Sequence, residues 1–528
     1  MVGGPPQGGA SRHEPPRASA FRRLLLARRS TTIEGTGISV DVSIRPGRLH
    51  GEVTIPASKS HTIRALIIAT LAEGESRIRH PLDSGDARAC IEACRALGAE
   101  IEERWAESEV RGVPAAENGG VEGGRTGGAP PARAGSAAAA RFGGAAPSGE
   151  LAEIVVRGTG GRIAAPSRAI DVVNSGTTLY LAAGAAALGT SEITFDGDRQ
   201  IRARPIQPLL DSLTRLGASA RSLKHNGCAP VAIRGPLYGG LTALEAHTSQ
   251  YLSSLLMACP LAEGDSEIDV PLLNERPYVE MTLRWLDEQG IRHRNEGFRR
   301  FFIPGRQHYA AFNRAVPGDF SSATFFLCAA AITGSTLTLR GLDMRDAQGD
   351  KEVVNILARM GCRVEIDEES ITISGPGAGG SRLVGCEIDL NAIPDALPAL
   401  AVTACCAEGT TRLVNVPQAR LKETDRIAVM HEELRKMGAS IEELPDGLLI
   451  EGFGPDAKLH GAHVNGHDDH RVVMALAVAG LAASGETVIA AAEAAAVTFP
   501  GFFSVLESAR ADGGAPEERR AARGATSP

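Results

Sequence analysis

Cationic side chains recur beside six short polar segments of this chain of 528 residues. The segments are SKSHTIR (58–64), NSGTTLY (174–180), TSQYLSS (248–254), GDFSSAT (318–324), PDALP (394–398) and DDHR (468–471). The basic residues in or near them are Lys59, Arg64, Arg202, Arg204, Lys422, Arg426, His470 and Arg471. A cleft that collected these side chains would suit a substrate with several negative charges, such as phosphates and carboxylates.

One further segment, RLKETDR (420–426), combines basic and acidic side chains within seven residues. A solvated helix face is the ordinary explanation for such a run. That explanation weakens because equivalent loops elsewhere in the chain also carry Lys or Arg. An aspartate and a glutamate among lysines and arginines should keep low pKa values and accept protons readily. This expectation applies to Asp395 of PDALP together with Glu423 of this segment, and the cations of the segment favour an anionic substrate.

Each polar segment precedes an Ala/Leu-rich stretch that ends at a glycine and continues into a β-prone segment. The glycines are Gly74, Gly189, Gly264, Gly334, Gly409 and Gly485. We expect each stretch to be a helix with its free N–H groups and positive dipole end at the polar segment. Capping explains any single segment taken alone. The basic residues of the whole set favour anion binding.

A second recurring phrase predicts an amphipathic helix that ends at glycine and leads into another strand. It reads RALGAEIEE (95–103), RLGASARSL (215–223), DEQGIRHRN (287–295), RMGCRVEID (359–367) and KMGASIEEL (436–444). Helices and strands in every unit predict α/β layers and not a helical solenoid. Six units of about 70 residues fit two three-unit domains better than one core.

Composition excludes several classes of protein. The net charge of −8 argues against a nucleic-acid partner, and no apolar run predicts a membrane helix. The nine cysteines form no CxxC pair, so we expect buried thiols in a reducing compartment. Neither a P-loop nor a dinucleotide fingerprint is present. The run HDDH (467–470) is isolated and precedes Arg471, so no metal site is expected.

Three segments lie outside the repeats. Residues 1–37 are Gly/Pro-rich and then basic, and we favour a disordered tail over a transit peptide. Residues 106–152 are of low complexity and are interpreted as a loop inserted between neighbouring elements. Residues 511–528 resemble a second disordered tail.

The ordered motifs of this chain resemble those of the EPSP synthase family, the 3-phosphoshikimate 1-carboxyvinyltransferases. The resemblance covers residues 38–508 apart from the insertion. The motifs that carry it are ASKSHTIRAL, NSGTT, RARPI, SQYLSSLLM, RPYVEMT, GDFSSATFF, IPDALP, RLKETDR, DDHRVVMA and TFPGFF.

The resemblance implies a two-domain inside-out α/β barrel with six βαβαββ-type repeats, three per domain. A double hinge joins the domains, with chain crossings expected near residues 57 and 316. The first domain would comprise 38–57 plus 317–510, and the second would comprise 58–316. We expect a monomer in the cytoplasm.

The resemblance also implies the reaction. The enolpyruvyl group of phosphoenolpyruvate moves to the 5-hydroxyl of shikimate 3-phosphate, phosphate leaves through a tetrahedral intermediate, and no cofactor takes part. Such chemistry needs a base, an acid and cations that hold phosphate and carboxylate. By motif match, Asp395 is the base toward the hydroxyl. Glu423 exchanges the proton at the methylene carbon, and Lys59 assists.

The substrate contacts that the resemblance implies fall into two sets. The shikimate 3-phosphate set is Lys59, Ser60, Arg64, Thr248, Ser249, Gln250, Tyr278, Asp395, Gln418 and Lys422. The phosphoenolpyruvate set is Lys59, Gly176, Thr177, Arg204, Gln250, Arg426 and Arg471. His470 is expected to shape the site from nearby.

The chain departs from the family pattern at four positions. Tyr180 and Val497 stand where the family has an arginine and a lysine, so two cations on the phosphoenolpyruvate side are missing. Glu275 replaces a serine that contacts the sugar phosphate, and it would repel phosphate unless it points away or pairs with Arg276. Gln418 replaces an asparagine, which is a milder change.

Two alternatives stay open. A UDP-N-acetylglucosamine enolpyruvyl transferase shares the fold but carries a reactive cysteine where this chain has Arg199, and Cys228 is well downstream. A non-catalytic relative that binds phosphorylated metabolites would fit the departures from the pattern. The presence of Lys59, Asp395 and Glu423 argues against it.

Overall fold

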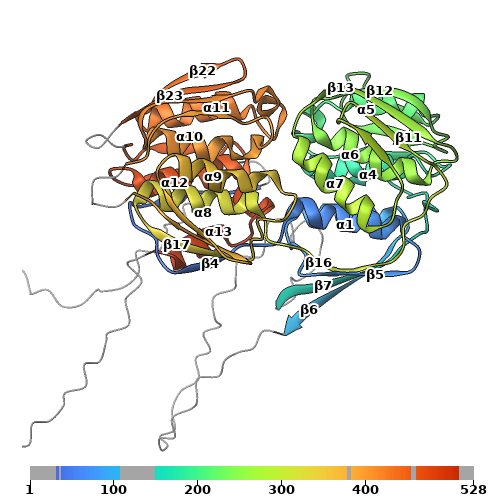
Figure 1. Cartoon of the computed structure of the whole chain (residues 1–528), viewed down its shortest axis with the longest axis horizontal. Helices are drawn as coiled ribbons and strands as arrows, with labels where there is room; N and C mark the ends of the chain where they lie inside the picture. Colours follow the sequence, from blue (N-terminus) through green and yellow to red (C-terminus); the bar gives the residue numbers. More distant parts are fainter. Residues whose placement is uncertain (1–30, 35–36, 108–148, 377–381, 454–458, 511–528) are drawn as a thin grey trace, which may run out of the picture.

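The computed structural model describes residues 31–34, 37–107, 149–376, 382–453 and 459–510. Two lobes of mixed α/β structure lie side by side (Figure 1). The central lobe is built on a hydrophobic core drawn from residues 63–316, and the terminal lobe on a second core drawn from 44–55 and 320–509. The start of the described chain therefore packs with its C-terminal half.

The central lobe contains three four-stranded sheets. Their strands are β5 (Glu75–Arg79), β6 (Glu100–Glu107), β7 (Gly149–Arg157), β8 (Ile170–Asp171), β9 (Ile193–Asp196), β10 (Ser219–Ser222), β11 (Val231–Arg234), β12 (Gly240–Ala246), β13 (Ser266–Leu273), β14 (Arg294–Glu296), β15 (Arg300–Ile303) and β16 (Asn313–Ala315). Its helices are α1 (Lys59–Leu71), α2 (Gly85–Ala96), α4 (Gly176–Ala186), α5 (Gln207–Arg215), α6 (Ser249–Ala258) and α7 (Arg276–Glu288).

The terminal lobe contains two four-stranded sheets and one three-stranded sheet. Their strands are β3 (Val42–Ile44), β4 (Glu52–Thr54), β17 (Thr336–Arg340), β18 (Arg363–Ile366), β19 (Ser370–Ser374), β20 (Glu387–Asp389), β21 (Glu408–Val414), β22 (Ser440–Leu444), β23 (Gly447–Phe453), β24 (His463–Asn465) and β25 (Thr487–Ala490). Its helices are α8 (Phe320–Thr333), α9 (Glu352–Arg359), α10 (Leu397–Cys405), α11 (Arg426–Lys436), α12 (His470–Ala482) and α13 (Phe502–Ser508), with short 3₁₀ turns such as η3 (Gly349–Lys351), η4 (Pro394–Ala396), η5 (Pro417–Leu421) and η6 (Ala492–Val497).

The six sheets share one pairing pattern. Each has a parallel pair at one edge: β16 with β5, β8 with β9, β12 with β13, β4 with β17, β20 with β21, and β24 with β25. The remaining pairs in these sheets are antiparallel. Parallel strands need a crossover helix, whereas antiparallel strands can follow a tight turn. The mixed α/β class expected from the sequence is therefore confirmed.

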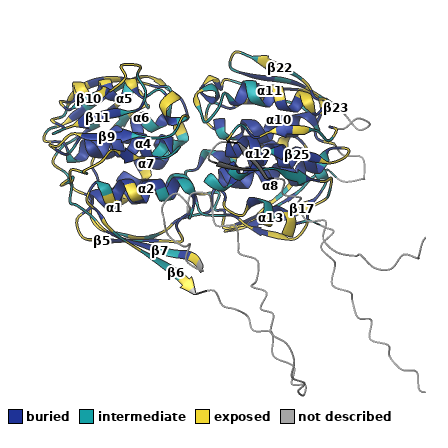
Figure 2. Ribbon diagram, turned by 180° about the vertical axis from the view of Figure 1, so that it is seen from behind, coloured by how far each residue is buried: buried dark blue, intermediate teal, exposed yellow. Residues whose placement is uncertain are grey.

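All six polar segments begin helices, as the sequence predicts. They start α1, α4, α6, α8, α12 and, after the turn η4, α10. Four of them cap their helix through a side chain, namely Ser175, Thr248, Asp319 and Asp469. These helices are buried almost all round (Figure 2), which explains why they are apolar and not amphipathic.

Helix α8 shows how the sequence sets such a helix. The carboxylate of Asp319 accepts a hydrogen bond from the N–H of Ser322 at 3.2 Å, which satisfies one free donor of the first turn. The helix ends at Gly334 in the left-handed conformation, with φ of +62°, and the N–H of this residue bonds the carbonyl of Ala330. A side chain would be strained there, so the repeat glycine is required at this helix end.

Three predicted segments fall largely outside the described residues. These are the tail over 1–37, the insertion over 106–152 and the tail over 511–528. Within the first, Thr31–Glu34 forms β1 and pairs antiparallel with β2 (Gly37–Val40), so the end of the predicted tail is strand. β-branched residues such as Thr31, Thr32 and Ile33 favour an extended backbone. Strands β6 and β7, which flank the insertion, pair with each other.

The chain passes between the lobes at two adjacent segments. The N–H of Ser58 bonds the carbonyl of Pro317 at 2.8 Å, and the N–H of Asp319 bonds the carbonyl of Pro56 at 2.9 Å. Both passages therefore lie side by side, directly before α1 and α8. No helix in the described ranges is long and apolar enough to cross a membrane. Six of the nine cysteines are buried, as the sequence predicts.

Candidate active site

A pocket between the lobes gathers the predicted residues. Its lining residues are Lys59, Ser60, Arg64, Asp86, Gly176, Thr177, Arg204, Ser249, Gln250, Glu275, Tyr278, Asp395, Lys422, Glu423, Arg426 and Arg471. Only Thr248 and Gln418 of the predicted contacts are absent from this lining. Thr248 touches the pocket residue Glu275 instead, and Gln418 donates to the carbonyl of Asn391 at 3.1 Å. The first turns of α1, α4, α6, α7, α11 and α12 supply most of the lining.

Arg426 is the hub of the terminal-lobe side of the pocket. Its side chain is 1% exposed. Its guanidinium contacts three carboxylates: Nη1 lies 2.8 Å from Asp395, Nη2 lies 2.6 Å from Glu423, and Nε lies 2.8 Å from Asp469. Opposite charges nearby stabilise a buried charge, and these four residues form a single unit. RLKETDR is therefore not a solvated helix face.

Asp395 faces the cations of the terminal lobe. Arg471 Nη2 lies 2.9 Å from its second oxygen. Burial alone would raise the pKa of Asp395, but the charges of Arg471 and Lys422 outweigh burial and hold this pKa well below its usual range. Asp395 is therefore ionised at neutral pH and can accept a proton, as the sequence predicts.

Glu423 links the two lobes. Its Oε1 lies 2.9 Å from Arg204 of the central lobe, while its Oε2 contacts Arg426. Burial opposes ionisation, but the charges of Arg204 and Arg426 hold the pKa of Glu423 well below its usual value. His470 lies beside it, and burial lowers the pKa of this imidazole so far that it is neutral at pH 7.

Asp86 and Gly176 of the central lobe position two further cations of the pocket, Lys59 and Arg204. Lys59 Nζ lies 3.1 Å from Asp86, which is buried in the first turn of α2. A Cβ atom at Gly176 would lie 2.3 Å from Arg204 Nη1. Only glycine therefore lets the Arg204 guanidinium lie against the first turn of α4.

Arg64 differs from the other pocket arginines because its partners are neutral. It donates to the hydroxyl groups of Thr282 and Ser253 and to the carbonyls of Tyr278 and Ser60, at 2.9–3.3 Å. No carboxylate pairs with it among the ion pairs of the described residues. Burial lowers its pKa to about 10, which leaves a positive charge at neutral pH without a counterion.

Glu275 takes neither of the two positions that would keep its charge away from a bound phosphate. It neither points away from the pocket nor pairs with Arg276, because Arg276 pairs with Glu280 at 2.9 Å. The Glu275 carboxylate instead contacts Lys422 of the terminal lobe. The neighbouring Arg276 side chain is exposed on the outer face of α7.

Tyr180 turns away from the pocket into the core of the central lobe. Its ring packs edge-on against Tyr251, with centroids 5.1 Å apart, and its hydroxyl donates to the carbonyl of Pro205. Val497 ends η6 and does not line the pocket. Positions 180 and 497 therefore contribute no cation to the pocket.

Three buried aspartates near the pocket were not singled out as site residues from the sequence. Asp86 holds Lys59, Asp469 caps α12 while it holds Arg426, and Asp350 accepts from the Tyr278 hydroxyl at 2.7 Å. Burial and the nearby Asp395 charge raise the pKa of Asp350 to about 7. The DDHR motif contained the signal for Asp469, since aspartate is a preferred N-cap. No comparable signal marked the other two.

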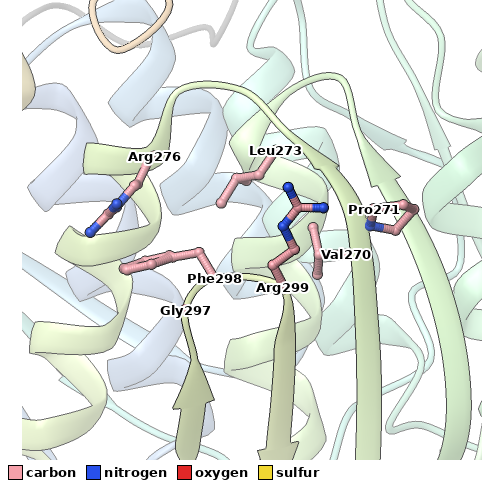
Figure 3. Close-up of a pocket in the computed structure, with 7 residues that line it drawn as sticks. All are labelled: Val270, Pro271, Leu273, Arg276, Gly297, Phe298 and Arg299. Carbon is pink, nitrogen blue, oxygen red and sulfur yellow. The ribbon is translucent and has the colours of Figure 1, made fainter.

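A second cavity opens on the central lobe (Figure 3). Its volume is about 180 Å³, against about 40 Å³ for the pocket between the lobes. It is lined by Val270, Pro271, Leu273, Arg276, Gly297, Phe298 and Arg299, and Arg276 lies over the Phe298 ring at 4.0 Å. This lining contains no acid, base or nucleophile set for catalysis. The smaller pocket, already filled by its own ion pairs, is the chemical site.

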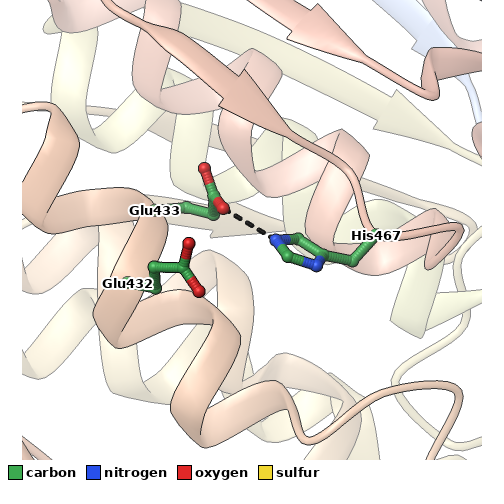
Figure 4. A group of neighbouring side chains, drawn as sticks. All are labelled: Glu432, Glu433 and His467. Carbon is green, nitrogen blue, oxygen red and sulfur yellow. Dashed lines mark hydrogen bonds and ion pairs between the residues drawn. The ribbon is translucent and has the colours of Figure 1, made fainter.

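Glu432, Glu433 and His467 form an acidic cluster on the terminal lobe (Figure 4). His467 Nε2 lies 2.7 Å from Glu433, which raises the pKa of the imidazole. Lys436 Nζ lies 2.9 Å from Glu432 and 2.8 Å from Glu433. The Lys436 ammonium group already pairs with both carboxylates. The cluster is therefore an ion-pair network that links α11 to the loop before α12.

The fold is that of a two-lobed α/β protein, and its pocket sets two carboxylates among arginines, which suits an enzyme with anionic substrates. A model of the family EPSP synthase (3-phosphoshikimate 1-carboxyvinyltransferase) matches residues 44–119 and 141–506. The chain therefore belongs to the EPSP synthase family.

Individual relatives agree with this membership. The chain is 48% identical to the 3-phosphoshikimate 1-carboxyvinyltransferase of Acetivibrio thermocellus, over 89% of this chain and 98% of that protein. It is 41% identical to the enzyme of the same name from Halobacterium salinarum, over 89% and 99%. A solved EPSP synthase from Acinetobacter baumannii superposes with a TM-score of 0.67 at 28% identity, over 89% of this chain and 98% of that one.

Proposed function

We propose that this enzyme transfers the enolpyruvyl group of phosphoenolpyruvate to the 5-hydroxyl of shikimate 3-phosphate, in the shikimate pathway to aromatic amino acids. The observation that carries the proposal is the Arg426 unit. One buried guanidinium holds Asp395 and Glu423 on the same wall, while Arg471 and Arg204 bracket them. Two carboxylates and several cations in one pocket are what an addition–elimination between two anions needs.

Asp395 is the proposed base in the addition step. It takes the hydroxyl proton of the acceptor as the acceptor oxygen bonds to C2 of phosphoenolpyruvate, and its depressed pKa keeps it ionised for that purpose. Glu423 delivers a proton to the methylene carbon in the same step. In elimination, Glu423 takes a proton back from the resulting methyl group as the bond from C2 to the phosphate oxygen breaks, and the proton held by Asp395 passes to the departing phosphate. Lys59 assists proton transfer.

Glu423 must gain a proton before it can act as the acid. In the structure described, Arg204 and Arg426 favour its ionised form. A bound phosphate and carboxylate would share the charge of these two arginines, which weakens their hold on Glu423 and raises its pKa. Substrate binding therefore prepares the acid.

The cations divide into two groups for the two substrates. Lys59, Arg204, Arg426 and Arg471, with Gly176, Thr177 and Gln250, are the proposed phosphoenolpyruvate contacts. Arg64, whose charge has no counterion in the described residues, is suited to the carboxylate of the acceptor. Ser60, Thr248, Ser249, Gln250, Tyr278, Asp395, Gln418, Lys422 and Lys59 complete the proposed acceptor site.

The finer architecture is part of the proposal. Six βαβαββ units, three in each lobe, would form two inside-out α/β barrels, with domains 38–57 plus 317–510 and 58–316. The shared pairing pattern of the sheets and the two separate cores support this division. The adjacent passages at 56–58 and 317–319 are suited to be a double hinge. One chain supplies every residue that lines the pocket, which supports a monomer. The proposed location is the cytoplasm.

Phosphate release tests the function. The purified enzyme should release phosphate when phosphoenolpyruvate and shikimate 3-phosphate are both present and not when either is omitted. Glu423→Gln should lower kcat by about 10²–10⁴, whereas Glu280→Gln, an exposed position on α7, should leave it within twofold. No release above background, or a Glu423→Gln variant that matches wild type, would contradict the proposal.

A further inference from the structure

Glu275 stands at an unusual backbone position and is buried. Its φ is +57° and its ψ is 41°, a left-handed conformation that few residues other than glycine adopt. The residue is 1% exposed. Although it directly precedes α7, its side chain does not cap that helix. The side chain instead reaches across to a different helix.

The Glu275 carboxylate is seated in a complete anion site. One oxygen accepts from the Thr248 hydroxyl at 3.0 Å, from the Ser249 N–H at 3.1 Å and from the Ser249 hydroxyl at 2.8 Å. The other oxygen contacts the Lys422 ammonium of the opposite lobe. These donors are the first turn of α6, with its positive dipole end, and a cation. We refer to Thr248, Ser249 and Lys422 as the anion cradle.

The cradle lies in the acceptor half of the pocket. Glu275 lines this pocket together with Arg64 and Tyr278. The cavity there is small, about 40 Å³, and the carboxylate of Glu275 already occupies an anion position in it, at the Ser249 N–H and beside Lys422.

Resting on the proposed function, we propose that Glu275 is a specificity-determining residue that competes for the cradle with the phosphate of the acceptor. A phosphate and a carboxylate cannot share three donors, because like charges a few ångströms apart repel strongly at low dielectric. Binding of the phosphorylated acceptor thus requires Glu275 to swing out and its buried charge to be rehydrated. An unphosphorylated acceptor leaves the pair of Glu275 and Lys422 in place. Glu275 consequently lowers the ratio of kcat/KM for the phosphorylated acceptor to kcat/KM for the unphosphorylated one.

Glu275→Ser tests this competition, with Glu275→Gln as a variant of the same shape and Glu280→Gln as the matched control on α7. The readout is the ratio of kcat/KM for shikimate 3-phosphate to kcat/KM for shikimate, at saturating phosphoenolpyruvate. We expect this ratio to rise at least tenfold in Glu275→Ser and less in Glu275→Gln, with the KM for phosphoenolpyruvate within twofold of wild type. A ratio that is unchanged or lower in Glu275→Ser would overturn the inference.

Direct binding separates this inference from the proposed function. In calorimetric titration with inorganic phosphate alone, Glu275→Ser should bind at least tenfold more tightly than wild type and Glu280→Gln should match wild type. Any phosphate site on the phosphoenolpyruvate side is common to all variants, so the difference reports on the cradle. Equal affinities would overturn the inference even in an active enzyme. Tighter binding without transfer to either acceptor would support the cradle and contradict the proposed function.

Discussion

The two walls of the pocket balance their charges differently. On the terminal-lobe wall, Arg426 contacts three carboxylates and Arg471 contacts Asp395, so the charges are paired within one lobe. On the central-lobe wall, Arg64 contacts neutral oxygens, and the carboxylate that pairs with Arg204 comes from the other lobe. Lys59 with Asp86 on the central wall, and Lys422 with Glu275 across the lobes, are also paired, so the contrast between the walls is the contrast between Arg426 and Arg64.

This difference matches the two tasks of the enzyme. Proton transfer needs carboxylates in fixed positions with controlled pKa values, and the Arg426 unit provides that. Substrate capture needs cations whose charge is not already neutralised, and Arg64 is the residue we propose for it. The difference teaches that a cation paired with a carboxylate must share its charge when a substrate binds, whereas the charge of Arg64 is already available.

The largest difference in the free energy of unfolding is expected between variants that lack Arg426 and variants that lack Arg64. Arg426→Met leaves three carboxylates without their shared cation and should lower the free energy of unfolding by about 3–5 kcal/mol. Arg64→Met removes a buried charge that has no counterion, so its cost should stay below about 1 kcal/mol. Urea unfolding of the ligand-free variants measures both. Equal losses at the two positions would break the comparison between the walls.

A smaller effect is expected at Asp350, which lies behind the pocket. Its pKa in the folded protein is about 7, above that of an ordinary carboxyl group, so the folded state holds the proton more tightly. Stability is therefore lost as the pH rises from about 4 to about 7. Asp350→Asn cannot ionise, so its stability relative to wild type should improve by about 1–4 kcal/mol between pH 5 and pH 8. Urea unfolding at both pH values tests this, and a parallel pH dependence in the two proteins would refute it.

The smallest effect is expected at the exposed ion pair between the lobes. Arg199 lies 3.3 Å from Asp468, with side chains 85% and 59% exposed. Solvent and salt screen such a pair, so Arg199→Ala should change the free energy of unfolding by less than about 1 kcal/mol. Arg204, 8% exposed and paired with Glu423, is the buried counterpart. If Arg199→Ala were as destabilising as Arg204→Ala in the same urea series, burial would not be what distinguishes them.

The sequence predicted the parts of the site that local rules determine. The six polar segments begin helices because capping residues and apolar runs act over a few residues, and they bring Lys59, Asp395 and Arg471 to one pocket. Partners distant in the chain were beyond those rules. Lys422 lies 147 positions from Glu275, so only the folded chain shows that this pair forms instead of the neighbouring pair with Arg276.

The direction in which a side chain points was the second feature that the sequence did not predict. A motif position showed that a cation was missing at Tyr180 but did not show that the tyrosine turns into the core against Tyr251. Only the structure shows that Asp86 and Asp350 are buried beside the pocket, because their sequence segments contain no recognisable motif. The sequence thus predicted the α/β fold and most of the lining, and the structure added the pairing of charges.

Turnover in D₂O examines the proposed chemistry at the reacting carbon. If Glu423 first protonates and then deprotonates C3, the carbon passes through a methyl group that contains one solvent-derived hydrogen. The product formed from phosphoenolpyruvate and shikimate 3-phosphate should then carry deuterium in its vinyl CH₂ group, as observed by NMR spectroscopy. Phosphate release with a vinyl group free of deuterium would contradict addition and elimination through Glu423.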